Sequence, residues 1–313
     1  MIPSITCISL ADGAPVKQFP AASVLCLGNF DGVHYAHRRL IRETKRLRDE
    51  QFPTAALGAF CFRVPSSFYL SDTPIPQLSS MEDKLRIFRE EGLEYAYLAE
   101  FPQVRTLSPK AFAKEILEGI CHSCGLACGF NYRFGTGGTG TPEDMQRILR
   151  IPVTVLPKET LLGDTVSSTR IRQLLLEGCS EAAAALLTVP YAITAEIIHG
   201  KAFGRTQGIP TVNQTFPERR LIPRYGVYLT RCTVHEHTYF GLSNVGVHPT
   251  VDKNAPVNCE TYLLDFSGDL YGSTMTVEFL EFLRPEICFD SEVELYAQID
   301  RDLAAARQRM LSY

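Results

Sequence analysis

The sequence lacks any strong excess of charge. Its 31 Lys and Arg against 35 Asp and Glu give a formal net charge of -4 and a pI near 6.0. Proteins that bind nucleic acid or anionic membranes usually present a clearly basic surface. The composition therefore gives no case for either partner, and any affinity for phosphate must come from a local arrangement of residues.

The sequence also lacks long hydrophobic runs and a secretion signal. No window approaches the roughly 18 consecutive apolar residues of a membrane-spanning helix. The start of the chain has neither a basic segment nor a sustained apolar core. We therefore expect a cytoplasmic protein with no membrane segment.

A disulfide framework is not expected either, because the ten cysteines accompany no secretion signal. The segment C-H-S-C-G-L-A-C holds Cys121, Cys124 and Cys128 beside His122, a pattern that can bind zinc or an iron–sulfur cluster. The alternative is a buried strand over residues 126–129 that points Cys128 into a core. We favour the strand, because no second cysteine pair follows at zinc-finger spacing.

The pattern of apolar residues predicts an α/β domain over residues 1–187. Helices are expected to begin at Ser80, Ser108 and Thr141, which carry N-cap signals. Strands alternate with these helices, and such alternation predicts a parallel, Rossmann-like sheet with ligands beyond the carboxyl ends of its strands. The expected strands are residues 24–27, 54–60, 95–98, 126–129 and 153–156.

The pattern changes near Thr188, and a second domain is predicted over residues 188–313. Its strands follow one another without helices, which favours an antiparallel β-barrel or a sandwich. A C-terminal helix that starts at Ser291 should close one side. The expected strands are residues 193–198, 226–232, 238–242, 260–266 and 274–283.

Residues 28–37, G-N-F-D-G-V-H-Y-A-H, form the most informative stretch. They join the first predicted strand of the sheet to a helix, and a strand-to-helix turn presents free backbone N–H groups and a helix dipole to a phosphate. His34 and His37 lie three apart on the first helical turn and can donate to phosphoryl oxygens. The spacing is neither that of a P-loop nor that of a classical dinucleotide fingerprint.

Two later stretches of the first half also carry polar groups suited to a ligand. Residues 129–140, G-F-N-Y-R-F-G-T-G-G-T-G, are rich in glycine, which permits close approach to a ligand but also marks an ordinary loop. Residues 166–172, V-S-S-T-R-I-R, begin a helix with hydroxyls and arginines in its first turn. Taken alone, the hydroxyls read as helix caps.

These three stretches resemble motifs of the HxGH nucleotidyltransferases, in the form typical of bacterial bifunctional FAD synthetases, which join a riboflavin kinase to an FMN adenylyltransferase. The second half is similar to the kinase of that family in G-K-A-F-G-R-T-Q-G-I-P-T-V-N at residues 200–213. N-V-G-V-H-P-T, C-E-T-Y-L-L-D-F and F-L-R-P-E follow from residues 244, 259 and 282 in the family's order. The resemblance spans nearly the whole chain.

For the first half, the resemblance implies transfer of an adenylyl group from ATP to FMN. His34 and His37 would be catalytic, stabilising charge at the α-phosphate. Nucleotide or flavin would bind at Gly28, Asn29, Phe30, Asp31, Asn131, Arg133, Ser168, Thr169 and Arg172.

For the second half, the resemblance implies phosphorylation of riboflavin by ATP. Glu260 would be the base, and Thr211 and Asn213, two residues apart on an extended segment, would bind Mg²⁺. The nucleotide would contact Gly200, Gly204 and Arg205. The implied partners are therefore small molecules, namely riboflavin, FMN and ATP, and self-association is left open.

Three positions of the first half depart from the family's pattern. Ala36 stands in place of a glycine, Val64 in place of a histidine, and Thr165 in place of an arginine found in some relatives. Two alternatives follow: a riboflavin kinase with a weakened or inactive adenylyltransferase domain, and a flavin-binding regulatory protein without turnover.

Overall fold

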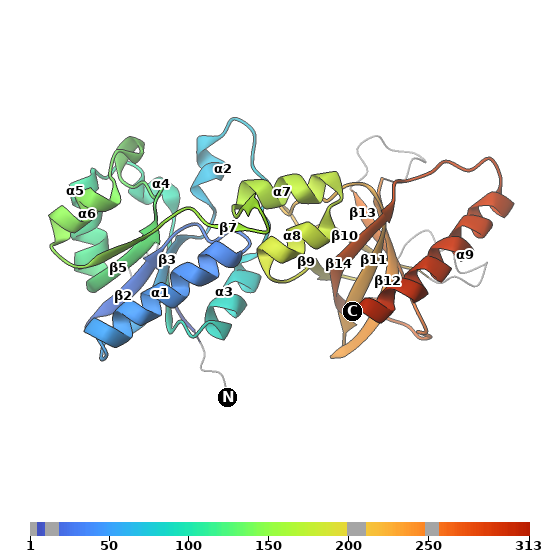
Figure 1. Cartoon of the computed structure of the whole chain (residues 1–313), viewed down its shortest axis with the longest axis horizontal. Coiled ribbons are helices and arrows are strands. Elements are labelled where there is room, and N and C mark those ends of the chain that lie inside the picture. The colour runs from blue at the N-terminus through green and yellow to red at the C-terminus, as the bar shows by residue number, and fades with distance from the viewer. Residues whose placement is uncertain (1–4, 10–18, 199–210, 248–256) are drawn as a thin grey trace. The chain divides into compact units, whose positions relative to one another are not determined.

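A computed structural model describes residues 5–9, 19–198, 211–247 and 257–313 (Figure 1). Contacts within the chain divide it into two compact units, Met1–Ser168 and Thr169–Tyr313. Helices α7 (Ser168–Glu177) and α8 (Ser180–Leu187) lie between this division and the boundary after residue 187 that the sequence predicts. The boundary after residue 187 stays a prediction.

The first unit contains a parallel six-stranded sheet, as predicted, in the order β1-β4-β3-β2-β5-β6. Short runs of apolar residues form the central strands because both faces of the sheet are covered. The edge strand β1 was not predicted, since four residues carry too little pattern. The strands are β1 (Thr6–Ser9), β2 (Ser23–Leu27), β3 (Ala56–Phe62), β4 (Tyr95–Ala99), β5 (Ser123–Gly129) and β6 (Val153–Leu156).

Helices cover both faces of this sheet. One face is covered by α1 (Tyr35–Gln51), which packs through Ile41, and by α3 (Met81–Glu90), which packs through Phe88. The other face is covered by α6 (Pro142–Leu149), which packs through Met145, and by the π-helical segment η1 (Phe112–Ile120), which packs through Leu117. The shorter elements are α2 (Ser66–Leu70), α4 (Phe101–Val104), α5 (Pro109–Ala111), η2 (Thr136–Gly138), β7 (Thr160–Leu161) and β8 (Asp164–Thr165).

The predicted helix starts are confirmed by their hydrogen bonds. Ser80 and Thr141 each form a capping box with the acidic residue three positions later, and the Ser108 side chain accepts from the backbone N–H of Ala111. Each cap satisfies N–H groups that the first helical turn leaves without an intrahelical partner.

The second unit is an antiparallel barrel, as predicted, in the order β10-β13-β12-β11-β14-β9. The two edge strands, β10 and β9, approach each other. Two hydrogen bonds join this side of the sheet: Ile198 N–H donates to Asn213 O at 2.8 Å, and Gln214 Nε2 donates to Ala195 O at 2.7 Å. The strands are β9 (Tyr191–Glu196), β10 (Thr211–Thr215), β11 (Gly226–Val234), β12 (His237–Gly246), β13 (Asn258–Leu263) and β14 (Thr274–Arg284).

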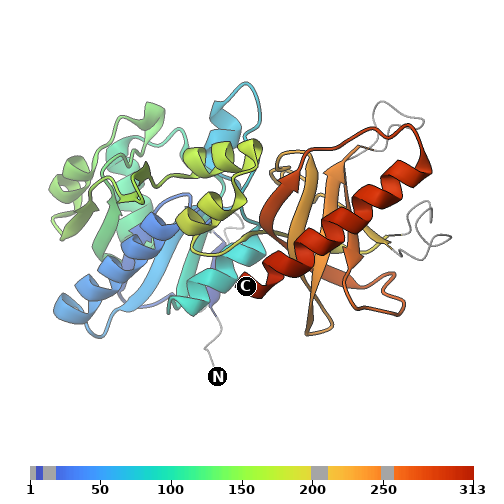
Figure 2. The same cartoon turned by 45° about the vertical axis from the view of Figure 1, so that its right-hand side comes forward.

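The C-terminal helix α9 (Glu292–Arg309) runs across the outside of this barrel (Figure 2). Its Ala306 packs against Leu229 of β11 and Leu242 of β12, and a short 3-10 turn, η4 (Met310–Ser312), follows. Leu242 and Asn244 are two residues apart on β12, so their side chains lie on the same face of the sheet, as does Glu260, which pairs with Asn244. The helix therefore covers one end of the face that carries Asn244 and Glu260.

Candidate active sites

The order of strands in the first sheet reverses at β2. The chain runs from β2 to β3 and β4 on one side, and then crosses to β5 on the other side. Because Leu27 pairs with Cys128, the carboxyl ends of β2 and β5 are neighbours, and the loops after them start side by side. Such a switch point is the usual place for a ligand in an open parallel sheet.

The loop after β2 has a strained backbone. Phe30, Gly32 and Val33 have φ values of 50°, 82° and 38°. For a β-branched residue such as Val33 this left-handed region is a rare conformation that costs about 1–3 kcal/mol. The surrounding structure must therefore hold the loop in place, as it does at many ligand-binding sites.

The segment before α3 supplies that support. Asp31 Oδ1 accepts the backbone N–H groups of Leu78 at 2.9 Å and Ser79 at 3.3 Å, while Ser79 Oγ accepts from Gly32 N–H at 2.9 Å. Ser168 Oγ donates to Asp31 O at 2.9 Å, which places this predicted residue against the loop. Asp31 is 4% exposed, and its carboxylate fixes the turn.

The two predicted histidines stack on each other at the start of α1. Their ring centroids are 3.7 Å apart, and the ring of His37 also lies 5.1 Å from that of Phe30. Burial lowers the pKa of His37 well below its ordinary value, and the nearby His34 and Lys84 lower it further. His37 is therefore a neutral imidazole at physiological pH, able to donate a hydrogen bond without carrying charge.

The N-terminus of α1 is left open to an anion. No acidic residue lies in its first turn, and the His34 side chain at the N-cap makes no capping hydrogen bond. The free N–H groups and the positive end of the helix dipole thus remain unneutralised by α1 itself. This geometry suits a phosphate, as the sequence predicts.

The other predicted residues of the first half are spread over two loops and helix α7. Asn131 and Arg133 follow β5 and are exposed at the neighbouring strand end. Gly28 N–H donates to Phe60 O at 3.2 Å, and Asn29 Nδ2 donates to Ser66 Oγ at 3.3 Å. Thr169 and Arg172 lie in α7 of the second unit, and their contacts with nucleotide stay predictions.

The predicted kinase residues meet across two paired strands. Asn213 of β10 lies opposite Glu260 of β13, and Thr211 lies two residues away on the same face. Thr211 Oγ1 donates to Glu260 Oε1 at 2.6 Å, and Asn258 Nδ2 donates to Asn213 Oδ1. Within the described residues, no hydrogen bond reaches the second oxygen of the Glu260 carboxylate.

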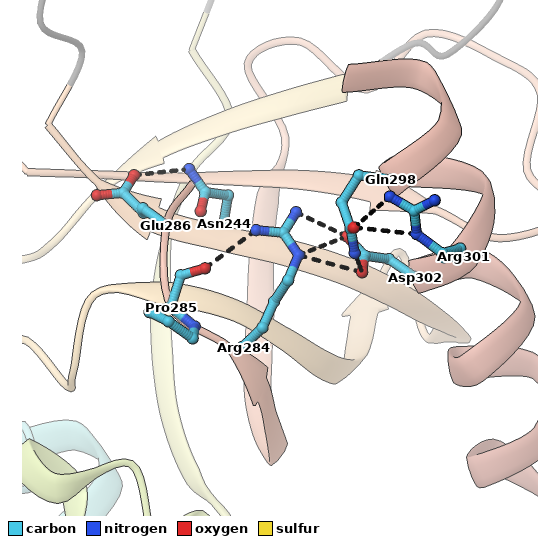
Figure 3. A network of polar contacts seen from close by, with 7 residues as sticks. All are labelled: Asn244, Arg284, Pro285, Glu286, Gln298, Arg301 and Asp302. Atoms are coloured by element: carbon cyan, nitrogen blue, oxygen red, sulfur yellow. Dashed lines mark hydrogen bonds and ion pairs between the residues drawn. The ribbon is translucent and has the colours of Figure 1, made fainter. Parts of the chain in front are cut away.

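Asn244 and Glu286 extend this face, and the sequence analysis gave them no role. Asn244 of β12 lies opposite Glu260, and its Nδ2 donates to Glu286 Oε1 at 3.2 Å (Figure 3). The Glu286 carboxylate lies over Gly246, in the space that a Cβ atom there would take. Both residues belong to motifs quoted in the sequence analysis: Asn244 begins N-V-G-V-H-P-T, and Glu286 ends F-L-R-P-E. Those motifs could have indicated that the two residues belong to the site.

An ion pair secures the chain just before Glu286. Arg284, at the end of β14, contacts both carboxylate oxygens of Asp302 in α9, with the shortest distance 2.7 Å from Nη2 to Oδ2 (Figure 3). Gln298 Nε2 also donates to Asp302 Oδ1 at 2.8 Å. The pair ties α9 to the strand end from which Glu286 reaches Asn244.

The remaining predicted kinase residues, Gly200, Gly204 and Arg205, lie outside the described residues.

The cysteine cluster lies within the described residues. Cys121 and Cys128 are buried, and Cys124 Sγ donates to Ser23 O at 3.3 Å. Burial raises the pKa of each of the three thiols. In the part of the chain that the structure covers, no three His, Cys, Asp or Glu side chains form a group that could hold a metal, and no helix is long and apolar enough to span a membrane.

Comparisons with known proteins match both halves of the chain. The family model described as FAD synthetase matches residues 16–170, and that described as riboflavin kinase matches residues 187–310. The protein named bifunctional riboflavin kinase/FMN adenylyltransferase from Listeria monocytogenes is 34% identical over 285 residues, covering 89% of this chain and 90% of the relative. The chain belongs to this bifunctional family.

Two further likenesses extend over nearly the whole chain. A protein of the same name from Escherichia coli K12 is 32% identical over 291 residues, with 91% of this chain and 92% of the relative covered. A crystal structure described as a macrolide-efflux protein from Streptococcus pneumoniae has a TM-score of 0.86 and 26% identity, covering 97% of this chain and 99% of its own. The fold is therefore that of known structures in both units.

Membership of this family implies Mg²⁺ as well as ATP and flavin. The strand face that carries Thr211, Asn213 and Glu260 must therefore suit the ion. Thr211 and Asn213 offer neutral oxygen atoms side by side next to the Glu260 carboxylate. Mg²⁺ binds few protein oxygens and completes its octahedron with phosphates and water. The two residues fit that requirement.

Proposed function

We propose that this chain converts riboflavin to FMN in its second unit and FMN to FAD in its first unit, consuming one ATP in each step. The observation that carries the proposal is the presence of two different phosphate-handling arrangements in one chain of this family. One is the His34–His37 stack at an open helix N-terminus, and the other is the Thr211–Glu260 pair on a barrel.

In the kinase step, the 5′-hydroxyl oxygen of riboflavin attacks the γ-phosphorus of ATP, and ADP leaves. Glu260 accepts the hydroxyl proton through the carboxylate oxygen that Thr211 does not occupy. Thr211 and Asn213 would hold Mg²⁺, which supplies charge neutralisation on the transferred phosphoryl group when bound. The strand register fixes these three side chains relative to one another before substrate binds.

In the adenylyl step, a phosphate oxygen of FMN attacks the α-phosphorus of ATP, and pyrophosphate leaves. No covalent intermediate with the protein is required. The imidazole of His34 and the neutral imidazole of His37 donate hydrogen bonds to the α-phosphate oxygens together with the first N–H groups of α1. Asn131, Arg133, Ser168, Thr169 and Arg172 would contact the remaining phosphates or the flavin.

Product chromatography after incubation with riboflavin, ATP and Mg²⁺ tests the proposal. Appearance of FMN followed by FAD is the expected result. FMN alone would favour the second candidate, a kinase with an impaired adenylyltransferase, for which Ala36, Val64 and Thr165 are the specific observation. Unchanged riboflavin would overturn both and favour a flavin-binding protein without turnover.

A further inference from the structure

Lys84 is a buried cation behind the loop of residues 28–34. It is the fourth residue of α3, and only 3% of its surface is exposed. Its ammonium donates to the backbone carbonyl of Asn29 at 2.8 Å, and its charge acts on His37. Lys84 thus lies against the segment that precedes the open N-terminus of α1.

Among the described residues, no carboxylate forms an ion pair with this ammonium. In the described part of the chain no acidic oxygen lies within ion-pair distance of Lys84 Nζ. The neighbouring Asp83 carboxylate accepts from Ser80 N–H and Oγ at 3.0 and 2.8 Å, and Asp31 Oδ1 is taken by backbone N–H groups. A buried ammonium without a contacting counterion is costly, and a bound anion would reduce that cost.

The hydrogen bond to Asn29 does not account for the charge. A neutral donor could satisfy the same carbonyl without the cost of burying an ion. The position is also unfavourable for a cation, because Lys84 lies near the N-terminal, positive end of α3. The charge therefore serves something beyond holding the loop.

Two positive features converge here in a chain whose net charge is -4. One is the ammonium of Lys84, and the other is the N-terminus of α1, which no acidic residue and no side-chain cap neutralises. Both act in a poorly solvated region, where electrostatic interactions are much stronger than in water. A polyanion bound at the loop would balance them.

We propose that Lys84 supplies the fixed positive charge that attracts and orients the triphosphate of ATP at the loop of residues 28–34. It acts as a positioning residue, through the Asn29 carbonyl and through its field. This role rests on the proposed adenylyl transfer, which it deepens by adding a residue that the family motifs quoted above do not contain.

The test uses two substitutions in the full chain. Lys84→Met keeps the length and packing of the side chain, and Lys84→Gln keeps a hydrogen-bond donor while removing the charge. We expect both to raise KM for ATP in FAD formation by about tenfold or more, with a smaller fall in kcat. FMN formation in the same samples should stay within about twofold of the unchanged protein, which shows that the chain is folded.

Lys45→Met is the matched control, because Lys45 is an exposed helix lysine paired with Asp49 at 3.0 Å. It should leave KM for ATP unchanged. Wild-type KM in Lys84→Gln would overturn the proposal, since the charge would then be dispensable. Loss of FMN formation together with FAD formation would also overturn it, because the effect would be on folding.

Binding of inorganic pyrophosphate, measured by calorimetry on the full chain, separates this proposal from the proposed function. Lys84→Gln and Lys84→Met should each weaken pyrophosphate binding by about tenfold, even if the unchanged protein makes no FAD. Equal affinity in the three proteins would overturn the role of Lys84, whatever the activity of the enzyme.

Discussion

The loop of residues 28–34, the proposed transferase site, and the face of β10, β12 and β13, the proposed kinase face, hold their candidate side chains in different ways. The loop has left-handed backbone at Phe30 and Val33 and depends on bonds from a distant segment, such as that from Leu78 N–H to Asp31. The kinase face is a regular ladder in which Asn213, Glu260 and Asn244 lie opposite one another by strand register alone.

This difference has a consequence for ionisation. The loop buries the His34 ring and keeps the half-buried His37 neutral, whereas the ladder leaves the half-buried Glu260 beside the hydroxyl of Thr211. Substitutions in the loop should therefore affect stability as well as chemistry. Substitutions on the kinase face should affect chemistry with little change in stability.

The largest expected effect is that of Glu260→Gln on the kinase. Glutamine keeps the size of the side chain but cannot accept the proton of riboflavin, so we expect FMN formation to fall by about 10³-fold. FAD formation from supplied FMN should continue at the rate of the unchanged protein. Both rates can be followed by chromatography in the same samples.

Glu196→Gln is the control, because Glu196 is an exposed glutamate at the end of β9 in the same barrel. It should leave both rates unchanged. Loss of FAD formation in Glu260→Gln would contradict the assignment of two separate sites.

The second prediction concerns the loop of residues 28–34 and the start of α1, where FAD formation and not FMN formation should be lost. His37→Ala removes a neutral donor from the start of α1, so FAD formation should fall by about 10²-fold or more, whereas FMN formation should continue. His122→Ala is the control, since this exposed side chain contacts Pro20 O through Nδ1 and the edge of the Phe19 ring, away from the loop of residues 28–34. Unchanged FAD output in His37→Ala would show that the loop is not the adenylyl-transfer site.

The third prediction concerns the support of the kinase face. Asp302→Asn leaves Arg284 half-buried without its counterion, which should lower the free energy of unfolding of the second unit by about 3 kcal/mol. The melting temperature should fall by roughly 10 °C in scanning calorimetry. Asp300→Asn, on the exposed side of the same helix, should change it by less than about 2 °C, and equal melting of the two variants would show that the ion pair is not stabilising.

Much of this fold could be predicted because it depends on short-range signals. Strands β2 to β6 contain short apolar runs, and Ser80 and Thr141 cap their helices through the residues that the sequence indicates. Strand β10 was not predicted, because T-V-N-Q-T has too few apolar residues to show alternation. The pairing of Asn213 with Glu260 is a long-range contact that the local pattern does not encode.

Lys84 shows where a signal existed and was not used. It lies three and four residues before Ile87 and Phe88, the other buried residues of α3, so helical spacing places it on the apolar face. A lysine is normally assigned to solvent on composition alone. Its contact with Asn29 also depends on how α3 meets the loop after β2, which only the three-dimensional structure gives.

The smallest expected effect is a pH dependence of stability confined to the first unit. The pKa of His37 is well below its ordinary value of 6.5 in the folded chain, so below that pH the unfolded state binds more protons than the folded state. The free energy of unfolding should therefore fall as the pH is lowered through about 6.5, by roughly 1.4 kcal/mol per pH unit for this residue. His37→Gln should reduce that slope, measured by urea unfolding between pH 5 and 7, whereas His122→Gln should not. An unchanged slope in His37→Gln would mean that burial of this imidazole does not set the acid stability of the first unit.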